Sequence, residues 1–313
     1  MFRKRLTRYG SVVTTAALAV MLLGVGGATA KTPAGWSMTV SPIVDQIGPG
    51  AVQGYNVHIT NTGPSNIAKL YLSTLDVSKS KAGTPISPAY SSLTGCNTGA
   101  DQGCAFGAFP VGRVVDLQLA YTAAAGDSPF KVEFDINTNG FVLGTNSSHG
   151  DSFRVSTSTT VNGSADFAGG FSLDGLSTFT TGAPSGSNNQ QSSVTGPNLL
   201  AITVTEGGGS PDATDPCTTY TCIGQWDRVT VGNHDQGPVR LVLNITGVPH
   251  STQASDINLY HTGEANNGIV SARCSSATPP SSEMPCITVT KLGTGHFQIV
   301  AWLLHNGGAR GLF

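Results

Sequence analysis

Apolar and polar residues alternate with a period of two along most of the chain. In residues 55–60 (YNVHIT) every second residue is apolar, and residues 115–121, 130–136 and 239–245 repeat the pattern. Side chains of a strand point to opposite faces in turn, so this alternation predicts strands with one buried face. Only 11% of the residues are charged, and 40 glycines with abundant Ser, Thr and Asn leave little material for exposed helices. We therefore expect an all-β protein.

A turn signal divides the first clear pair of strands. Residues 61–66 (NTGPSN) combine residue types that tolerate positive φ, fix φ, or bond their own backbone. A second apolar run follows at residues 67–77. We therefore predict a strand, a tight turn and a second strand here.

The remaining apolar runs predict two sets of strands. The first set is expected at residues 36–44, 55–60, 67–77, 115–121, 130–145 and 152–161. The second is expected at residues 199–205, 228–231, 239–245, 257–261, 269–274, 287–290 and 296–304. Without an internal repeat, these sets predict two different β-sandwich domains, at residues 31–162 and 163–313.

A stretch at residues 175–197 is rich in Ser, Gly and Asn. It is too long for a compact connection unless it contains edge strands or is mobile.

Residues 1–30 have the organisation of a secretory signal peptide. Four basic residues precede an apolar segment at residues 12–25, and Ala28-Thr29-Ala30 forms a small-residue cleavage site. The apolar segment is short for a bilayer-spanning helix, which is the alternative. We expect cleavage before Lys31 and an extracellular or cell-surface location.

Charge argues against two classes of partner. The chain has 16 Lys and Arg, and the four in the predicted signal peptide leave 12 against 18 Asp and Glu, a net charge of −6. Nucleic acids and anionic membranes prefer basic surfaces. We expect neither as a partner, and no membrane span after signal cleavage.

The six cysteines fall into three pairs that are close in sequence. An exported chain meets an oxidising environment, so we predict local disulfides that close short loops. A zinc site is the alternative for the pair separated by four residues. The predicted pairs are Cys96 with Cys104, Cys217 with Cys222, and Cys274 with Cys286.

Two segments resemble a known family. The turn at residues 61–65 and the segment Cys104-Ala-Phe-Gly-Ala-Phe109, followed by Gly112, resemble the Ig-like repeats of the bacterial domain-of-unknown-function-eleven family. The resemblance covers about residues 38–161, with Phe106 and Phe109 where the family usually has leucine. It implies an Ig-like sandwich in a secreted or cell-surface protein. Residues 285–307 resemble a C-terminal β-module of secreted bacterial proteins.

The strongest candidate for a metal site is a calcium loop at residues 135–142. Asp135, Asn137 and Asn139 place oxygen atoms at alternate positions before Gly140, as calcium loops do. An Asn-Gly hairpin at the end of a strand explains the same residues. We expect no other cofactor.

Exposed aromatic residues would suit stacking on sugar rings. We expect Tyr220 and Trp36 to be the exposed ones, and Trp226 and Trp302 to lie in the core.

The sequence contains no motif that assembles a catalytic nucleophile. No Gly-x-Ser-x-Gly turn, His-Glu-x-x-His pair or phosphate-binding glycine loop occurs, although paired carboxylates could still meet in a cleft. We predict a non-catalytic structural or adhesive protein that binds a cell-envelope component or another surface protein. A polysaccharide-binding module with exposed aromatics is the alternative.

Overall fold

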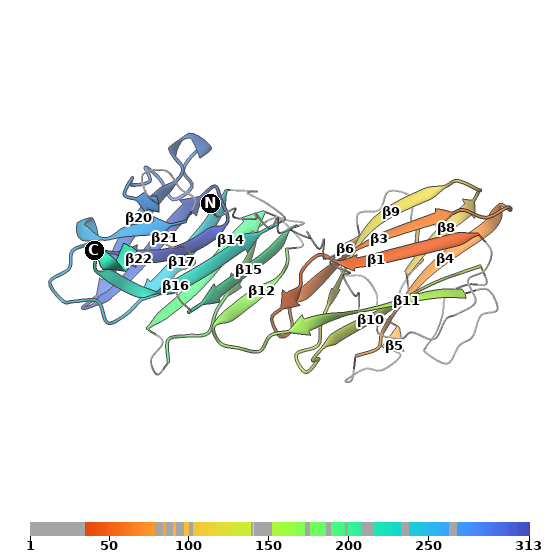
Figure 1. The fold of residues 1–313 in the computed structure, drawn as a ribbon, viewed down its shortest axis with the longest axis horizontal. Coiled ribbons are helices and arrows are strands. Elements are labelled where there is room, and N and C mark those ends of the chain that lie inside the picture. Colours follow the sequence, from red (N-terminus) through yellow and green to blue (C-terminus); the bar gives the residue numbers. More distant parts are fainter. Residues whose placement is uncertain are drawn as a thin grey trace, which may run out of the picture. The chain divides into compact units, whose positions relative to one another are not determined.

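The computed structural model is all-β. It describes residues 35–78, 84–85, 90–91, 97–99, 103–138, 140, 152–172, 176–185, 189–197, 200–207, 216–232, 238–262 and 268–313. The described helical segments are short 3-10 turns: η1 (Pro216–Thr218), η2 (Ala254–Asp256) and η4 (Ser281–Glu283). The strands form four sheets that pack as sandwiches, which confirms the predicted fold class (Figure 1).

The first two sheets contain the strands up to residue 161. One has the order β1-β3-β9-β6, and the other has the order β2-β11-β10-β4-β8-β7 with β5 paired to β4. Neighbouring strands are antiparallel except β2 and β11. The bounds are β1 (Trp36–Pro42), β2 (Gln46–Ile47), β3 (Val52–Asn61), β4 (Ile67–Asp76), β5 (Thr84–Pro85), β6 (Tyr90–Ser91), β7 (Asn97–Gly99), β8 (Gly103–Phe109), β9 (Val114–Thr122), β10 (Phe130–Asn137) and β11 (Ser152–Val161).

The other two sheets contain the remaining strands. Their orders are β12-β15-β16-β22-β18-β19 and β13-β14-β17-β21-β20. The bounds are β12 (Phe167–Phe171), β13 (Leu176–Thr180), β14 (Gln190–Pro197), β15 (Ala201–Glu206), β16 (Cys222–Val231), β17 (Val239–Ile245), β18 (Asn258–His261), β19 (Ile269–Val270), β20 (Cys286–Gly293), β21 (His296–Leu303) and β22 (Gly307–Leu312).

The first core lies between strands of the first two sheets. The aromatic rings of Tyr55 on β3 and Tyr121 on β9 pack against the ring of Phe134 on β10. The distances from their ring centroids to that of Phe134 are 5.2 and 6.1 Å. All three side chains are buried. Burial of each large apolar side chain contributes roughly 1.5 to 3 kcal/mol.

A second core joins the five- and six-stranded sheets. It contains Val194, Leu243 and Ile299 from the five-stranded sheet, and Ile202 and Val229 from the six-stranded sheet. Residues Lys31–Phe313 form one compact unit that contains both cores. The division at residues 162 and 163 therefore stays a prediction, as does the cleavage of residues 1–30, which belong to the part that the structure does not describe.

The predicted turn at residues 61–66 is built around one buried asparagine. Asn61 Oδ1 accepts a hydrogen bond from Gly63 N at 3.0 Å, which closes the turn. Its Nδ2 donates to the Phe109 carbonyl at 2.8 Å and so ties the turn to β8. The turn connects β3 to β4, as expected, although these two strands belong to different sheets.

The Ser-, Gly- and Asn-rich stretch contributes two strands. β13 is an edge strand and β14 is its neighbour, so this stretch contains an edge strand, one of the two predicted possibilities. Thr178 and Thr180 on β13 bond Thr195 and Ser193 on β14 through their hydroxyl groups.

Near the C-terminal end, one predicted strand is shorter than expected, and one strand is present that was not expected. The strand expected at residues 269–274 ends at Val270, and Arg273 instead forms an isolated parallel bridge with Ile287. β22 was not predicted, because its sequence GGARGL lacks β-branched and aromatic residues. A Cβ on Gly311 would lie 2.7 Å from the Ile223 side chain, so close packing against β16 explains a glycine in this strand.

Candidate functional site

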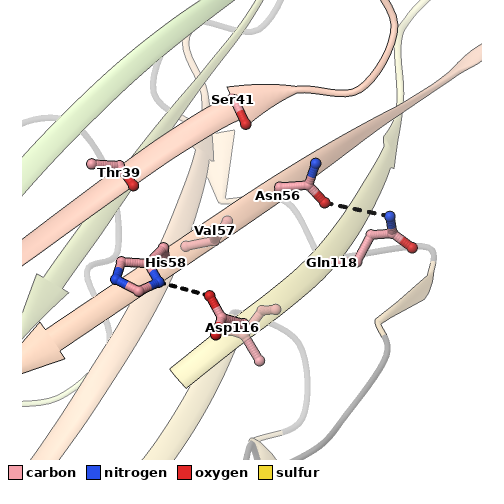
Figure 2. A pocket seen from close by; sticks show the side chains of 8 residues that line it. Thr39, Ser41, Asn56, Val57, His58, Asp116 and Gln118 are labelled. Carbon is pink, nitrogen blue, oxygen red and sulfur yellow. Dashed lines mark hydrogen bonds and ion pairs between the residues drawn. The ribbon is translucent and has the colours of Figure 1, made fainter. Parts of the chain in front are cut away.

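The outer face of sheet β1-β3-β9 carries a grid of exposed polar side chains. Residues on this face alternate with core residues along each strand. The strand register aligns them in two rows: Thr39, His58 and Asp116 in one row, and Ser41, Asn56 and Gln118 in the next. Figure 2 shows these side chains projecting from three neighbouring strands. We call this set the polar face.

Hydrogen bonds across and along the strands join four of the six side chains of the polar face. His58 Nδ1 lies 2.7 Å from Asp116 Oδ1, and His58 Nε2 lies 2.9 Å from Thr60 Oγ1. Gln118 Nε2 donates to Asn56 Oδ1 at 3.4 Å. In the Nδ1–H tautomer, His58 donates to Asp116 Oδ1, and its Nε2 accepts from the Thr60 hydroxyl.

The polar face surrounds a shallow depression of about 430 Å³. Its lining consists of the six residues of the polar face together with Val57 and Leu117 (Figure 2). Both apolar residues are almost fully buried, at 1% and 3% exposure, so they form its floor. The polar atoms that the depression exposes belong to hydroxyl, amide, imidazole and carboxylate groups, and apolar atoms make up almost half of its lining.

The Thr60, His58 and Asp116 side chains have the connectivity of a nucleophile, a base and an orienting acid. Acyl transfer also needs hydrogen-bond donors for the developing oxyanion. β3 pairs with β1 on one side and with β9 on the other, so its backbone N–H groups are used in the sheet. The polar face is therefore better suited to binding a ligand by hydrogen bonds than to activating the Thr60 hydroxyl as a nucleophile.

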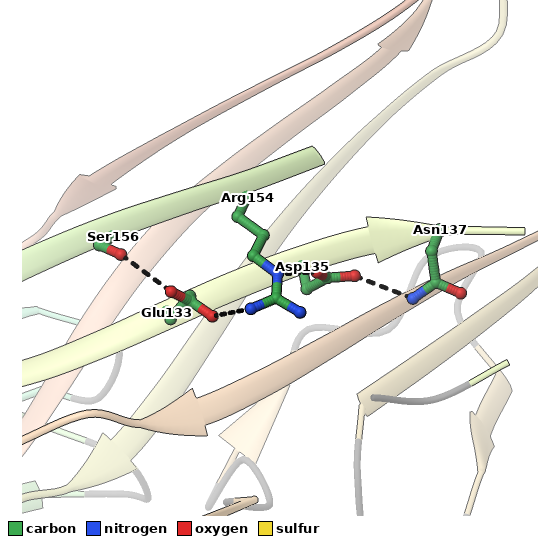
Figure 3. Close-up of polar contacts among 5 residues, drawn as sticks. All are labelled: Glu133, Asp135, Asn137, Arg154 and Ser156. Carbon is green, nitrogen blue, oxygen red and sulfur yellow. Dashed lines mark hydrogen bonds and ion pairs between the residues drawn. The ribbon is translucent and has the colours of Figure 1, made fainter. Parts of the chain in front are cut away.

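The predicted calcium ligands lie in a different network. Asp135 and Asn137 are fully buried on β10, and Asn139 lies outside the described residues. Arg154 Nε lies 2.5 Å from Asp135 Oδ2, and Asn137 Nδ2 donates to Asp135 Oδ1 at 2.9 Å. Figure 3 shows the Arg154 guanidinium between Asp135 and Glu133.

Arg154 supplies the positive charge that a calcium ion would bring to Asp135. Both carboxylate oxygens of Asp135 already accept hydrogen bonds, and Asn137 presents its amide nitrogen rather than its oxygen. Calcium binding at Asp135, Asn137 and Asn139 stays a prediction, and this geometry gives it no support. The described residues contain no cluster of three or more His, Cys, Asp or Glu side chains that could hold a metal ion.

A second polar network lies inside the other sandwich. Glu206 and Asp227 face each other across β15 and β16, and both are almost fully buried. Ser192 Oγ donates to Asp227 Oδ1 at 2.8 Å, and Gln190 Nε2 donates to Asp227 Oδ2 at 2.5 Å. The Thr181 hydroxyl donates to Glu206. The two carboxyl groups thus lie within the protein interior.

Burial raises the pKa of Asp227 well above its ordinary value. Desolvation is the largest cause, because a carboxylate removed from water loses its hydration. Hydrogen bonds from Ser192 and Gln190 lower the pKa, and the charge of Glu206 raises it further. Asp227 therefore tends to keep its proton in the folded chain.

Two of the three predicted disulfides are present in full. Cys217 bonds Cys222, and Cys274 bonds Cys286, with Cα atoms 5.3 and 5.1 Å apart. Cys104 is also disulfide-bonded, while its predicted partner Cys96 lies outside the described residues. A zinc site was the alternative for Cys217 and Cys222. Both sulfur atoms are instead joined in a disulfide.

Replacing Cys274 and Cys286 by serine should lower the free energy of unfolding by about 3 kcal/mol. This disulfide closes a loop with a sequence separation of 12, and a closed loop restricts the unfolded chain more as it lengthens. The matched change, serine at Cys217 and Cys222 with a separation of 5, should cost about 2 kcal/mol. Denaturant titration of both variants measures the two values, and the reverse order would contradict this account.

Tyr220 and Trp36 were expected to be exposed, and only Tyr220 is. Tyr220 is 44% exposed, beside η1 within the disulfide loop. Trp36 is only 7% exposed, so the expectation that it is exposed is wrong. It begins β1, where the alternation places it with Met38 on the face that packs into the first core. Trp226 and Trp302 are buried, as predicted.

The sequence did not reveal the polar face or the network around Glu206 and Asp227 as sites. Asn56, His58 and Thr60 were recognised as the polar side of one strand, but the register that places Asp116 beside His58 was unknown. Glu206 and Asp227 are separated by 21 positions in sequence, and no local pattern indicates that they meet. Polar residues at inward positions of a strand were the only available signal.

Among the described residues, no helix has the length and hydropathy needed to cross a bilayer.

Comparisons with known proteins identify no family. No family model matches the chain, and no curated protein matches it. The solved structures that match the chain include the following two, and the similarity is weak. The sporulation control protein Spo0M from Bacillus subtilis is 10% identical, with 68% of this chain and 80% of that chain covered and a TM-score of 0.25. The secreted serine protease VesC from Vibrio cholerae is 11% identical, with 88% of this chain and 49% of that chain covered and a TM-score of 0.25. This chain therefore spans about half the length of VesC, and similarity this low carries no argument about function.

Proposed function

We propose that this chain is an exported, non-catalytic protein with a structural or adhesive role at the cell surface. The observation that carries the proposal is the distribution of polar groups. Asp135 and Asp227 are buried and hydrogen-bonded, whereas accessible polar side chains, including Asp116, cover outer sheet faces such as the polar face. Such surfaces suit contact with a partner.

Export has separate support. The disulfides at Cys217–Cys222 and Cys274–Cys286 fit an oxidising compartment. The predicted signal peptide and the resemblance to Ig-like repeats of surface proteins point the same way. The expected partner is a cell-envelope component or another surface protein.

Polysaccharide binding through exposed aromatics is the second candidate. Tyr220 is exposed and could stack on a sugar ring. Trp36, the other predicted sugar-stacking residue, is buried. The structure therefore gives no support to polysaccharide binding through this pair of aromatic residues.

The test is retention of the folded mature chain, Lys31–Phe313, on envelopes prepared from its own cells. We expect the chain to sediment with the envelopes, and the same chain after reduction and alkylation to sediment less, because its loops lose their disulfides. A chain that stays entirely in the supernatant would contradict a surface role.

A further inference from the structure

The polar face is accessible, and four of its six side chains are already joined in two pairs. The side chains of His58 and Asp116 are 48% and 77% exposed, yet they are joined by a 2.7 Å contact. Asn56 and Gln118 are joined in the same way across β3 and β9. Because cross-strand bonds already restrict these side chains, a ligand that binds them costs less conformational entropy.

The chemistry of the polar face suits a ligand rich in hydroxyl groups. Each amide of Asn56 and Gln118 offers both donors and an acceptor, and the hydroxyls of Thr39 and Ser41 can do either. A sugar hydroxyl also donates and accepts, so one ligand chemistry can pair with every group of the lining. The three strands span about 10 Å at the usual strand spacing.

The charge of the depression disfavours an anionic ligand. No lysine or arginine lines it, and Asp116 is its one carboxylate. Anionic polysaccharides and phosphates are bound by cationic side chains, which this lining lacks. The surplus of acidic over basic residues in the whole chain acts in the same direction.

A protein partner is less well matched to this surface. Protein interfaces take most of their binding energy from exposed aromatic, apolar and arginine side chains that become buried. Here the apolar lining residues Val57 and Leu117 are already buried beneath the strands. Val114, which is 47% exposed, lies on the same sheet but does not line the depression.

We infer that the polar face is a binding site for a neutral polysaccharide. Asn56, Gln118 and His58 are its principal contacts, Asp116 orients His58, and the sugar chain lies across β1, β3 and β9. This site uses hydrogen bonds from a sheet face and does not involve Tyr220. The inference rests on the proposed surface role, since it names the envelope component that the protein contacts.

The experiment is calorimetric titration of the mature chain with three soluble neutral hexasaccharides. The probes are the β-1,4-linked glucose, β-1,3-linked glucose and β-1,4-linked N-acetylglucosamine oligomers. We expect at least one to bind, and the double variant Asn56→Ala, Gln118→Ala to weaken binding by about tenfold, because two neutral hydrogen bonds are lost. Both side chains lie on the surface, so a thermal melt should show the variant to be folded.

The chain offers a matched control on another sheet. Gln298 Nε2 donates to Asn244 Oδ1 at 3.0 Å across β21 and β17, which is the same kind of amide pair. The variant Asn244→Ala, Gln298→Ala should change the affinity by less than twofold.

Several results would overturn the inference. They are an equal loss in both double variants, loss of binding on Tyr220→Ala alone, or no binding of any of the three probes. Retention on envelopes without oligosaccharide binding would overturn this site and leave the proposed surface role standing. If the wild-type chain is not retained on envelopes, that result would contradict the proposed surface role itself.

Discussion

Replacing Arg154 with methionine should lower the free energy of unfolding by about 3 to 5 kcal/mol. The change leaves the carboxylate of Asp135 buried without its positive partner, and the nearby Glu133 loses the same partner. Removing one member of a buried ion pair costs this much because the remaining charge is neither hydrated nor neutralised. Chemical denaturation of the purified mature chain measures the loss.

A double-mutant cycle separates the ion pair from simple packing. Replacing Asp135 with asparagine in the Arg154→Met background removes the unpaired charge, so the double variant should recover part of the lost stability. The matched control is Arg240→Met, at a partly exposed strand position on β17, which should change stability by less than 1 kcal/mol. An Arg154→Met loss no larger than the control would show that Asp135 is not held by this pair.

The contribution of Asp227 to the stability of the protein should fall as the pH rises above about 4. In the unfolded chain this carboxyl group ionises near its ordinary pKa of 3.8, whereas burial raises its pKa well above that value in the folded chain. Between these two pKa values the folded state binds more protons than the unfolded state, so stability decreases with rising pH. The decrease stops above the folded-state pKa, where both states have lost the proton.

The size of this effect follows from linkage. Each pH unit over which the folded protein keeps the proton and the unfolded chain does not lowers the free energy of unfolding by about 1.4 kcal/mol. Fluorescence-detected urea titrations of the wild type and of Asp227→Asn, at intervals from pH 4 to pH 9, give the difference directly. Other groups that titrate in this range cancel in that difference.

Asp227→Asn should be close to the wild type at pH 4 and more stable than it at high pH. Asparagine imitates the protonated acid, with an oxygen for the Gln190 amide and an N–H for the Ser192 hydroxyl, which can also accept. Glu206→Gln should reduce the pH dependence only in part, because Glu206 is a smaller cause of the raised pKa than burial. A constant difference between wild type and Asp227→Asn across the range would refute a titrating Asp227.

Local chemistry was sufficient to predict most strands and the turn at residues 61–66. Tyr55, Val57 and Ile59 are buried and Asn56 and His58 are exposed, as the alternation on β3 predicted. Cysteines close in sequence paired as expected at Cys217–Cys222 and Cys274–Cys286, where short loops keep the thiols near each other. These features depend on neighbours within a few residues, so a single sequence is enough to predict them.

Predictions were wrong where distant contacts determine the outcome. Trp36 is buried because the pairing of β1 with β3 directs its side chain, with that of Met38, into the first core. β22 forms although its residues have poor strand propensity, because it fills the gap between β16 and β18 and completes their hydrogen bonds. Tertiary pairing outweighs local propensity at such central positions.

For this protein the sequence alone determined the all-β class, the disulfides Cys217–Cys222 and Cys274–Cys286, and the polar side of β3, because each depends on residues close together in the chain. Only the tertiary structure placed Asp116 beside His58, Arg154 beside Asp135, and Glu206 opposite Asp227. Strand register decides these contacts, and a shift of one residue would move every side chain to the opposite face. The packing of whole sheets selects that register, and a strand's own sequence does not reveal it.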